Sequence, residues 1–341
     1  MVGRLMSNLS PQEALACIKV LIFMARADGI FRAEEEEILL ETCRNLDLPP
    51  DVSLLDLVRQ DIDLEAELAQ ITSPAAREQV YAAALAMACA DRNRSVEERE
   101  VLARIKQAFR IPQEQADFIQ RLLEDTRSTL LPTPIAPIRD PVERERRIDQ
   151  IIRNYAIFTA VLGAFPVPGL ALVTDIAVLT FQLKMIEEIG QYWGYQVQRR
   201  EAELLRDGMV GGVGISLFRI AVSNAAKLVP GWGSVVGASL SYASTWAIGK
   251  VANQYYASGG KLDRQTLQEA FRQARREGEQ EYQKNRALIQ AQQQAHADRI
   301  QQLNQQLQRG EITQAEYEQK LQELSQTLAS SGGSAGQPRQ D

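Results

Sequence analysis

The sequence is poor in the residues that most often carry enzyme chemistry. It has one histidine, His296, and three cysteines among 341 residues. The histidine lies in a glutamine-rich stretch, with no second histidine or cysteine nearby to complete a zinc site or a catalytic pair. The motifs G-x-x-x-x-G-K-[ST], G-x-S-x-G and H-E-x-x-H are also absent. We therefore expect a protein that is not an enzyme and that has no certain cofactor.

The cysteines and the net charge indicate the cellular compartment and the kind of partner. Cys17, Cys43 and Cys89 cannot all pair, and each lies in an apolar stretch, so we expect reduced core thiols in a cytoplasmic protein. Residues 1–8 lack an apolar signal segment, which favours the same compartment. A net charge of −6 gives no general attraction to nucleic acid, and we expect none as a partner.

A repeat occupies the first third of the sequence. The pattern that starts at Ser10-Pro11 returns 63 residues later at Ser73-Pro74, and eleven of 41 aligned positions are identical. Each copy predicts a helix, an acidic corner and a second helix. Ser10 with Glu13 and Ser95 with Glu98 have the spacing of capping boxes. We also expect one helix over 54–68 between the copies, and another over 115–124 after them. These features predict an all-α bundle.

The repeated corners resemble those of the TerB-like (tellurite-resistance B) family over about residues 10–123. The resemblance is carried by Ala27-Asp28-Gly29 before Glu34-Glu35, and by Ala90-Asp91 before Glu97-Glu98. It implies a stress-associated helical module with an acidic, metal-binding face. The first corner is the better candidate for a divalent metal, because the second carries arginine at positions 92, 94 and 99. The candidate ligands of the first corner are Asp28, Glu34, Glu35 and Glu37; those of the second are Asp91, Glu97 and Glu98.

A simpler interpretation competes with the metal site. Acidic residues in the first turn of a helix interact favourably with the helix dipole while their side chains stay in water. We favour this interpretation of the acidic corners. An EF-hand is excluded, because Ile30 and Arg32 stand where a loop that starts at Asp28 would need oxygen ligands.

The middle of the sequence is the most apolar part. Residues 156–183 contain one formal charge, Asp175, and residues 228–249 contain none. Pro-Gly breaks divide these runs, and each half of the first run is too short to cross about 30 Å of hydrocarbon, although 228–249 is long enough to span. The runs therefore predict either buried helices of a soluble domain or hairpins that enter a membrane from one side, and we favour membrane association. The residues expected in these hairpins are Pro166, Pro168, Gly169, Asp175, Pro230 and Gly231.

This apolar region resembles a YcjF-type domain of unknown function over about residues 149–256. The resemblance is carried by Phe165-Pro166-Val167-Pro168-Gly169, Gln182-Leu183-Lys184-Met185-Ile186 and Leu228-Val229-Pro230-Gly231. It implies helical hairpins, membrane association and an Era-like GTPase as a partner. It brings no catalytic residues.

The last third is polar and glutamine-rich, which predicts a long solvated helix. Residues 300–324 resemble the SHOCT (short C-terminal) motif, with Gly310 ending one helix and Thr313 and Glu316 capping the next. That resemblance implies contact with a partner or homo-oligomerisation.

Together these patterns predict an all-α protein with a TerB-like helical bundle, an apolar helical-hairpin domain and a long polar C-terminal helix. The expected boundaries are 1–128 for the bundle, 129–141 for a proline-rich linker, 142–260 for the apolar domain, 261–299 for the polar helix, 300–328 for the SHOCT-like hairpin and 329–341 for a disordered tail. We expect a membrane-associated adaptor in a bacterial stress response, peripheral or monotopic at the cytoplasmic face. The alternative is a soluble regulatory partner of an Era-like GTPase.

Overall fold

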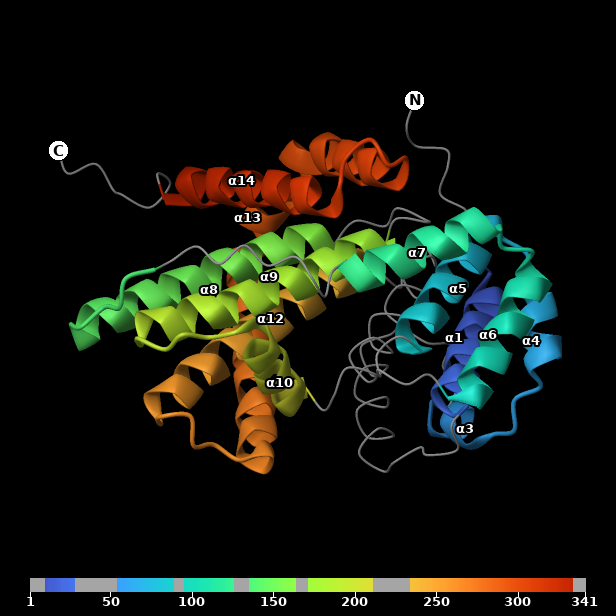
Figure 1. Ribbon diagram of the computed structural model, residues 1–341, viewed down its shortest axis with the longest axis horizontal. Coiled ribbons are helices and arrows are strands. Elements are labelled where there is room, and N and C mark those ends of the chain that lie inside the picture. Colours follow the sequence, from blue (N-terminus) through green and yellow to red (C-terminus); the bar gives the residue numbers. More distant parts are fainter. Residues whose placement is uncertain are drawn as a thin grey trace. The chain divides into compact units, whose positions relative to one another are not determined.

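Helices form every element of secondary structure that the computed structural model describes, which confirms the all-α prediction (Figure 1). The structure describes residues 10–27, 54–88, 95–125, 135–163, 171–210 and 234–333. The helices fall into two compact units. The N-terminal unit contains α1 and α3 to α7 together with the first residues of α9 and α12, and the C-terminal unit contains α8, α10, α13, α14 and the rest of α9 and α12. The boundary falls inside α9 after Asp175 and inside α12 after Gly237.

The N-terminal unit is a bundle built around α1. Its helices are α1 (Pro11–Ala25), α3 (Leu54–Arg59), α4 (Leu64–Gln70), α5 (Pro74–Ala88), α6 (Val96–Phe109) and α7 (Gln113–Asp125). Helix α1 packs against α4, α5 and α6, and α5 packs against α6 and α7. The core contains Ile18, Leu21 and Ile22 of α1 together with Ile105 of α6, each at most 1% exposed. Their spacing of three or four residues places them on one helix face.

The repeat is visible in the helix starts. Helices α1 and α5 both have 15 residues and both begin with the proline that follows a serine. The Ser10 hydroxyl accepts a hydrogen bond from the Glu13 amide at 3.1 Å, and the Ser73 hydroxyl accepts one from the Ala76 amide at 3.5 Å. The predicted capping box of Ser95 and Glu98 is present at the start of α6. Cys17 is buried, as expected, while Cys43 and Cys89 lie outside the described residues.

Glu13 does not complete a capping box at Ser10, so that prediction is wrong. Its Oε1 atom instead accepts hydrogen bonds from the amides of Thr72 and Ser73, at 2.7 and 2.6 Å. The first copy of the repeat therefore caps the start of the second. The single helix expected over 54–68 is also wrong: it breaks into α3 and α4, because Asp63 takes an extended conformation and caps α4 through the Ala66 amide.

The helices of the C-terminal unit pack against one another. They are α8 (Pro141–Gly163), α9 (Ala171–Tyr192), α10 (Arg199–Val210) and α12 (Ser234–Ala257), followed by α13 (Arg264–Gln308) and α14 (Gln314–Gly333). Phe158 of α8 meets Phe181 of α9 edge to face, with ring centroids 4.8 Å apart. Helix α13 packs against α8 and α14, and α14 also packs against α8. No described helix has the combination of length and hydropathy required to cross a bilayer.

Two glycines allow the helices of this unit to approach closely. A Cβ atom on Gly249 of α12 would lie 2.6 Å from the Ile152 side chain of α8. A Cβ atom on Gly278 of α13 would lie 2.9 Å from Cα and 3.0 Å from the carbonyl oxygen of Ala243 on α12. A side chain can move aside, but helix backbone cannot do so without shifting the helix. Gly278 therefore sets the distance between α12 and α13.

The C-terminal hairpin forms as the motif predicts. Helix α13 runs unbroken past residue 300, so the polar helix and the first arm of the hairpin are one helix of 45 residues. Gly310 has a left-handed φ of 69° just after it, and Thr313 and Glu316 form the capping box of α14. The buried Tyr317 hydroxyl donates a 2.6 Å hydrogen bond to Asn304 Oδ1, which fastens α14 to α13.

Candidate functional site

A cleft of about 310 Å³ opens on the N-terminal unit. Of the described residues, three segments line it: the end of α1 with the two residues after it, the loop between α3 and α4, and α6 from Glu97 to Arg104. The lining residues are Phe23, Arg26, Ala27, Asp61, Ile62, Glu97, Glu100, Val101 and Arg104. Val101 is buried, and Phe23 and Ile62 are partly buried, whereas Asp61, Glu97 and Glu100 are exposed. The cleft thus has an apolar floor and carboxylates at its rim.

The two arginines of the cleft are already engaged. Arg104 binds both carboxylate oxygens of Glu65 through its Nη2 atom, at 2.5 Å each, and its guanidinium lies 5.8 Å from the centre of the Phe23 ring. Arg26 donates a 3.1 Å hydrogen bond to the carbonyl oxygen of Gln60. Asp61, Glu97 and Glu100 have no ion-pair partner within the described part of the chain. A neutral carbonyl oxygen does not cancel the charge of Arg26, so among the described lining residues three carboxylates without an ion-pair partner stand against one guanidinium, and the rim is net negative.

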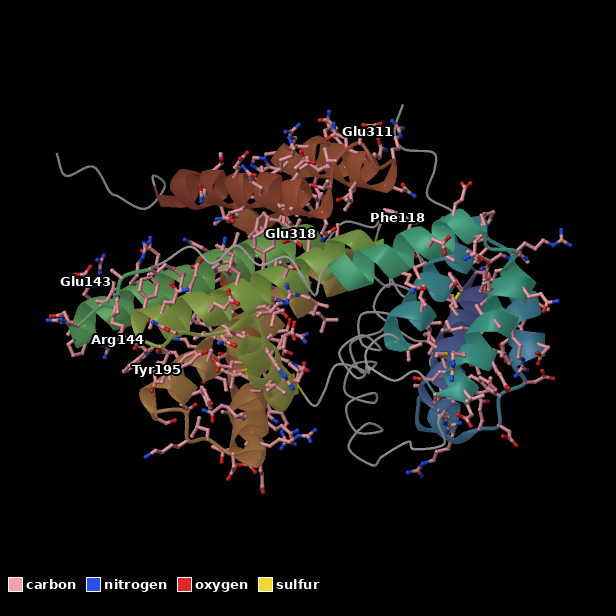
Figure 2. All side chains as sticks on the ribbon, in the orientation of Figure 1. Phe118, Glu143, Arg144, Tyr195, Glu311 and Glu318 are labelled. Atoms are coloured by element: carbon pink, nitrogen blue, oxygen red, sulfur yellow. The ribbon has the colours of Figure 1, made fainter. Side chains whose placement is uncertain are left out.

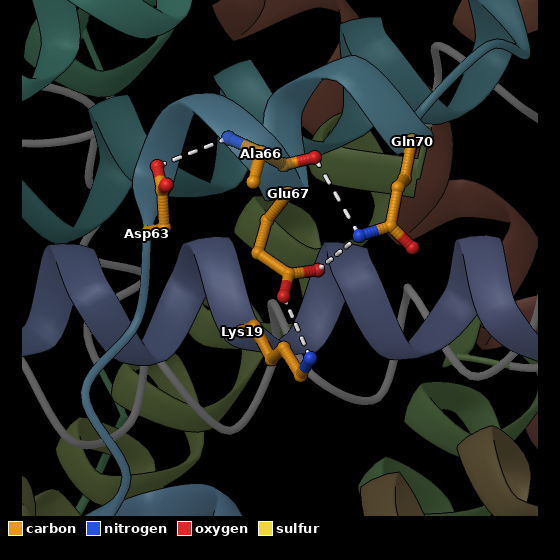
Figure 3. A network of polar contacts seen from close by, with 5 residues as sticks. All are labelled: Lys19, Asp63, Ala66, Glu67 and Gln70. Atoms are coloured by element: carbon orange, nitrogen blue, oxygen red, sulfur yellow. Dashed lines mark hydrogen bonds and ion pairs between the residues drawn. The ribbon is translucent and has the colours of Figure 1, made fainter.

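A polar network holds the loop that carries Asp61 and Ile62 (Figure 3). Lys19 of α1 forms a 2.6 Å ion pair with Glu67 of α4, and Glu67 accepts a 3.1 Å hydrogen bond from the Gln70 side chain. Asp63 caps α4 in the same network through the Ala66 amide at 3.2 Å. Because both ion-pair partners are mostly buried, with 19% and 11% of their side chains exposed, the pair fixes α4 against α1. The rim of the cleft is thereby anchored.

The predicted acidic corners are only partly within the described structure. Asp28, Glu34, Glu35, Glu37 and Asp91 lie outside the described residues. Glu97 lines the cleft, whereas Glu98 turns back and accepts a 2.8 Å hydrogen bond from the Ser95 amide. The two adjacent glutamates thus have different roles. Among the described residues, no group of three or more His, Cys, Asp or Glu side chains is placed to hold a metal ion.

Of the residues predicted to lie in membrane hairpins, the structure describes only Asp175. Pro166, Pro168, Gly169, Pro230 and Gly231 lie outside the described residues. Asp175, near the start of α9, is 7% exposed and has an interaction partner.

A chain of polar side chains crosses the core of the C-terminal unit. Thr159 of α8 donates to Thr245 of α12 at 2.9 Å, and the Gln182 amide of α9 donates to Thr245 at 3.0 Å. Gln182 Oε1 in turn accepts a 3.1 Å hydrogen bond from the buried Arg206 of α10. Four helices are therefore joined by hydrogen bonds inside an apolar core, where each bond is costly to lose.

Helix α9 also buries Lys184 and Glu187 and half-buries Glu188, of which only Lys184 belongs to a motif noted in the sequence. Burial raises the pKa of Glu187 to about 7, against the opposing effects of Arg199 and then Lys184. Burial likewise raises the pKa of Glu188, although this carboxylate accepts a 2.7 Å hydrogen bond from the Tyr155 hydroxyl. The signal was available in the sequence, as Lys184 lies one helical turn before the adjacent Glu187 and Glu188 at the end of an apolar run.

Lys184 is the third of these groups. Its Nζ atom is buried and has no hydrogen-bond partner among the residues that the structure describes. Burial lowers the pKa of its ammonium group, while the nearby carboxylates of Glu188, Glu187 and Glu318 oppose that change. Glu318 projects from α14 toward α8 (Figure 2), so the C-terminal hairpin contributes charge to this cluster.

The fold and the cleft together define an all-α protein of two helical units with a carboxylate-rimmed surface cleft. Residues 6–123 match the family described as "Protein of unknown function (DUF533)", which is TerB-like, and residues 298–324 match the "Short C-terminal domain" family, SHOCT. Both predicted resemblances are confirmed over these ranges. The matched ranges do not include residues 142–260, so the YcjF-type resemblance stays a prediction.

Two curated proteins are similar to part of the chain. It is similar to magnetosome membrane protein 22 of Magnetospirillum gryphiswaldense, with 29% identity over 136 residues, which is 38% of this chain and 68% of the relative. It is also similar to an uncharacterized protein of Synechocystis sp., with 28% identity over 123 residues, 35% of this chain and 78% of the relative. No solved structure matches the chain.

Proposed function

We propose that this protein is a non-enzymatic, membrane-associated adaptor. The observation that carries the proposal is the similarity to a protein named as a magnetosome membrane protein, at 29% identity over 136 residues. The surface cleft of the N-terminal unit supports the adaptor role, because it offers a partner both apolar contact and charge. The TerB-like match supports a role in a tellurite-resistance-like stress response.

The three regions would divide the work of such an adaptor. The N-terminal unit would recognise a partner and would sense a divalent metal through Asp28, Glu34, Glu35 and Glu37. The C-terminal unit would dock at the cytoplasmic face of a membrane. The SHOCT hairpin would recruit a protein or a second copy, and its capped start and buried Tyr317 give it the rigidity that such contact needs.

The packing of the C-terminal unit favours peripheral docking over insertion. The apolar residues of α8, α9 and α12 that would face lipid in an inserted hairpin are buried against one another. Insertion would have to part α8 from α12 and break the hydrogen bond between Thr159 and Thr245. Peripheral docking leaves this core intact.

The same packing favours a second candidate, a soluble regulatory partner of an Era-like GTPase. A unit that buries its apolar helices against one another has no need of lipid to cover them. The two candidates differ in what the full-length chain should bind: vesicles in the first case and an NTP-binding protein in the second.

Flotation of the full-length protein with phosphatidylethanolamine–phosphatidylglycerol vesicles tests the membrane proposal. We expect the protein to float with the vesicles and to be released by salt or alkaline washing. In a Trp193→Phe and Trp232→Phe double variant, brominated lipids should leave Trp246 unquenched, because its side chain is buried in the unit, whereas insertion would quench it. Protein that stays at the bottom of the gradient, and that co-purifies instead with an NTP-binding protein, would reject the membrane role in favour of the alternative.

Calorimetric titration of the full-length chain with Mg²⁺, Mn²⁺ and Zn²⁺ tests the metal proposal. Binding that is lost in a Glu34→Gln and Glu35→Gln double variant, but kept in Glu114→Gln, supports the first acidic corner as the site. The control Glu114 is an exposed carboxylate on α7, away from both corners in the sequence. The absence of heat at millimolar metal would end the idea.

A further inference from the structure

The cleft of the N-terminal unit has the chemistry of a receptor for a basic side chain. Its volume of about 310 Å³ is at the lower end of the range of about 300–1,000 Å³ that ligand pockets span. A space of this size accommodates one long side chain and its neighbours rather than a dinucleotide. The floor is apolar, with Phe23, Ile62 and Val101, while the carboxylates stand at the rim.

Lysine and arginine match this division. Each has an apolar stem that packs on apolar surface and a cationic end that reaches toward water or an anion. In the cleft, the stem would lie on the floor and the cationic end would reach Asp61, Glu97 or Glu100. Arg104 is paired with Glu65, and Arg26, which donates to the neutral Gln60 carbonyl, balances at most one of the three, so the described rim stays net negative.

The same observations argue against other ligands. A divalent metal needs oxygen ligands that converge on one point, and the described residues provide no group of three acidic or imidazole ligands placed in this way. An anion, such as a nucleic acid phosphate, would be repelled by the three carboxylates. A purely apolar segment would desolvate the rim without compensating its charge.

We propose that the cleft binds a lysine or arginine of a partner protein, presented on a segment with apolar neighbours. This inference rests on the proposed adaptor function and names the chemistry of the partner. The anchored loop before α4 supports it, since the pair of Lys19 and Glu67 holds the rim in place before the partner arrives.

The test measures fluorescence polarisation of short labelled peptides with the full-length protein. One peptide has a central Leu-Lys-Leu, and the matched peptide has norleucine in place of the lysine. We expect the lysine peptide to bind at least about tenfold more tightly, and its affinity to fall as the salt rises from about 50 mM to about 300 mM. Equal binding of the two peptides, or no binding of either, would overturn the proposal.

Two charge-reversed variants make the test specific. Glu100→Lys places a positive charge on the rim and should weaken binding of the lysine peptide at least about tenfold. Glu114→Lys makes the same change on α7, outside the cleft, and should leave binding within about twofold of the wild type. Equal losses in the two variants would show general charge attraction and reject the cleft. If Glu100→Lys does not fold by circular dichroism, the milder pair Glu97→Gln and Glu100→Gln replaces it, with the same expected direction.

Two further readouts distinguish this inference from the metal proposal and from the membrane proposal. Loss of peptide binding at low-millimolar Mg²⁺, without a change in ionic strength, would assign the rim to a metal and overturn the basic-partner proposal. Vesicle flotation of Glu100→Lys should match that of the wild type. Intact flotation without any peptide binding therefore rejects the cleft inference alone, whereas lost flotation with intact peptide binding rejects the membrane role alone.

Discussion

The two units are both helical, yet they place their polar groups differently. In the N-terminal unit, Glu13, Asp63 and Ser95 cap helix starts, and the mostly buried ion pair of Lys19 and Glu67 joins α1 to α4. In the C-terminal unit, polar groups cross the core, and Lys184 and Glu187 are buried among apolar helices.

This difference indicates which substitutions should destabilise each unit most. A cap satisfies backbone amides locally, so its loss costs about one hydrogen bond and leaves the core intact. A close helix contact or a buried charge acts on the whole core, because neighbouring helices must move or a charge must stay away from water. We therefore expect substitutions in the C-terminal unit to have the larger effects.

The largest effect is expected at the contact between α12 and α13. Gly278→Val should lower the free energy of unfolding of the C-terminal unit by about 3 kcal/mol, because the new side chain meets the backbone of Ala243. Urea unfolding gives the magnitude, and hydrogen exchange of α12 and α13 shows which unit opens. Gly208→Ala is the control: its Cβ atom would lie 3.4 Å from the Leu267 side chain, so the gain in helix propensity should stabilise by up to about 1 kcal/mol. Equal stability of the two variants would contradict the close approach.

The next effect is a pH dependence confined to the C-terminal unit. The folded protein holds the proton of Glu187 more tightly than the unfolded chain does, because burial raises the pKa of this group from 4.5 to about 7. This contribution to stability is therefore present at low pH, declines as the pH rises through about 4.5 to 7, and is absent above that range. The decline amounts to about 2–3 kcal/mol.

The variant Glu187→Gln should remove that decline, because glutamine has no proton to lose. Stability would be measured by urea unfolding at about pH 5 and about pH 8, with hydrogen exchange to assign it to the C-terminal unit. Glu114→Gln, which removes a carboxylate from the N-terminal unit, is the matched control. If Glu187→Gln keeps the wild-type pH dependence of stability in the C-terminal unit, that dependence does not come from Glu187.

A smaller effect is expected at the junction of the two repeat copies. Glu13→Ala should destabilise the N-terminal unit by about 2 kcal/mol, because the amides of Thr72 and Ser73 lose a charged acceptor. Gln12→Ala, one residue earlier and exposed, should change stability by less than about 0.5 kcal/mol. Thermal unfolding of both variants, monitored by helix content, would show the difference. If both variants unfold at the wild-type temperature, the hydrogen bonds of Glu13 do not contribute to stability.

The smallest effect is expected at the surface of α4 and α6. Glu65→Gln breaks the ion pair with Arg104, in which 64% and 44% of the two side chains are exposed. The loss should be no more than about 0.5 kcal/mol and should vanish in high salt, because water and ions screen exposed pairs. A loss of stability as large as that of Glu13→Ala would show that the ion pair of Arg104 is more than an exposed surface pair and helps to hold the cleft together.

The sequence predicted the features that depend on neighbours along the chain. Ser95 with Glu98 and Thr313 with Glu316 were recognisable as capping boxes, since each box closes within four consecutive residues. The repeat predicted two equivalent helices, and α1 and α5 have the same length and the same start. Glu13 failed for the same reason: its spacing fits a box, but the amides of Thr72 and Ser73, from a distant segment, bind it instead.

The candidate site was less predictable. Glu97 was singled out in the sequence as part of an acidic corner, whereas Asp61 and Glu100 were not. Glu100 lies one helical turn after Glu97 on α6, but Asp61 joins them only when the α3–α4 loop comes to lie beside α6. Glu98 next to Glu97 was assigned the same role but serves as a cap. The spacing of Ser95 and Glu98 indicates the cap, but no local pattern shows that Glu97 faces a cleft.

The sequence by itself determined the helical fold, the repeat, the capped helix starts and the short C-terminal hairpin, because hydrophobic periodicity and capping act over a few residues. Only the tertiary structure decided that the apolar middle buries its helices against one another, that Gly278 meets the backbone of Ala243, and that Lys184 and Glu187 lie in a core. An apolar run has the same composition whether lipid or another helix covers it, and the charge on a side chain does not reveal how far that side chain is from water.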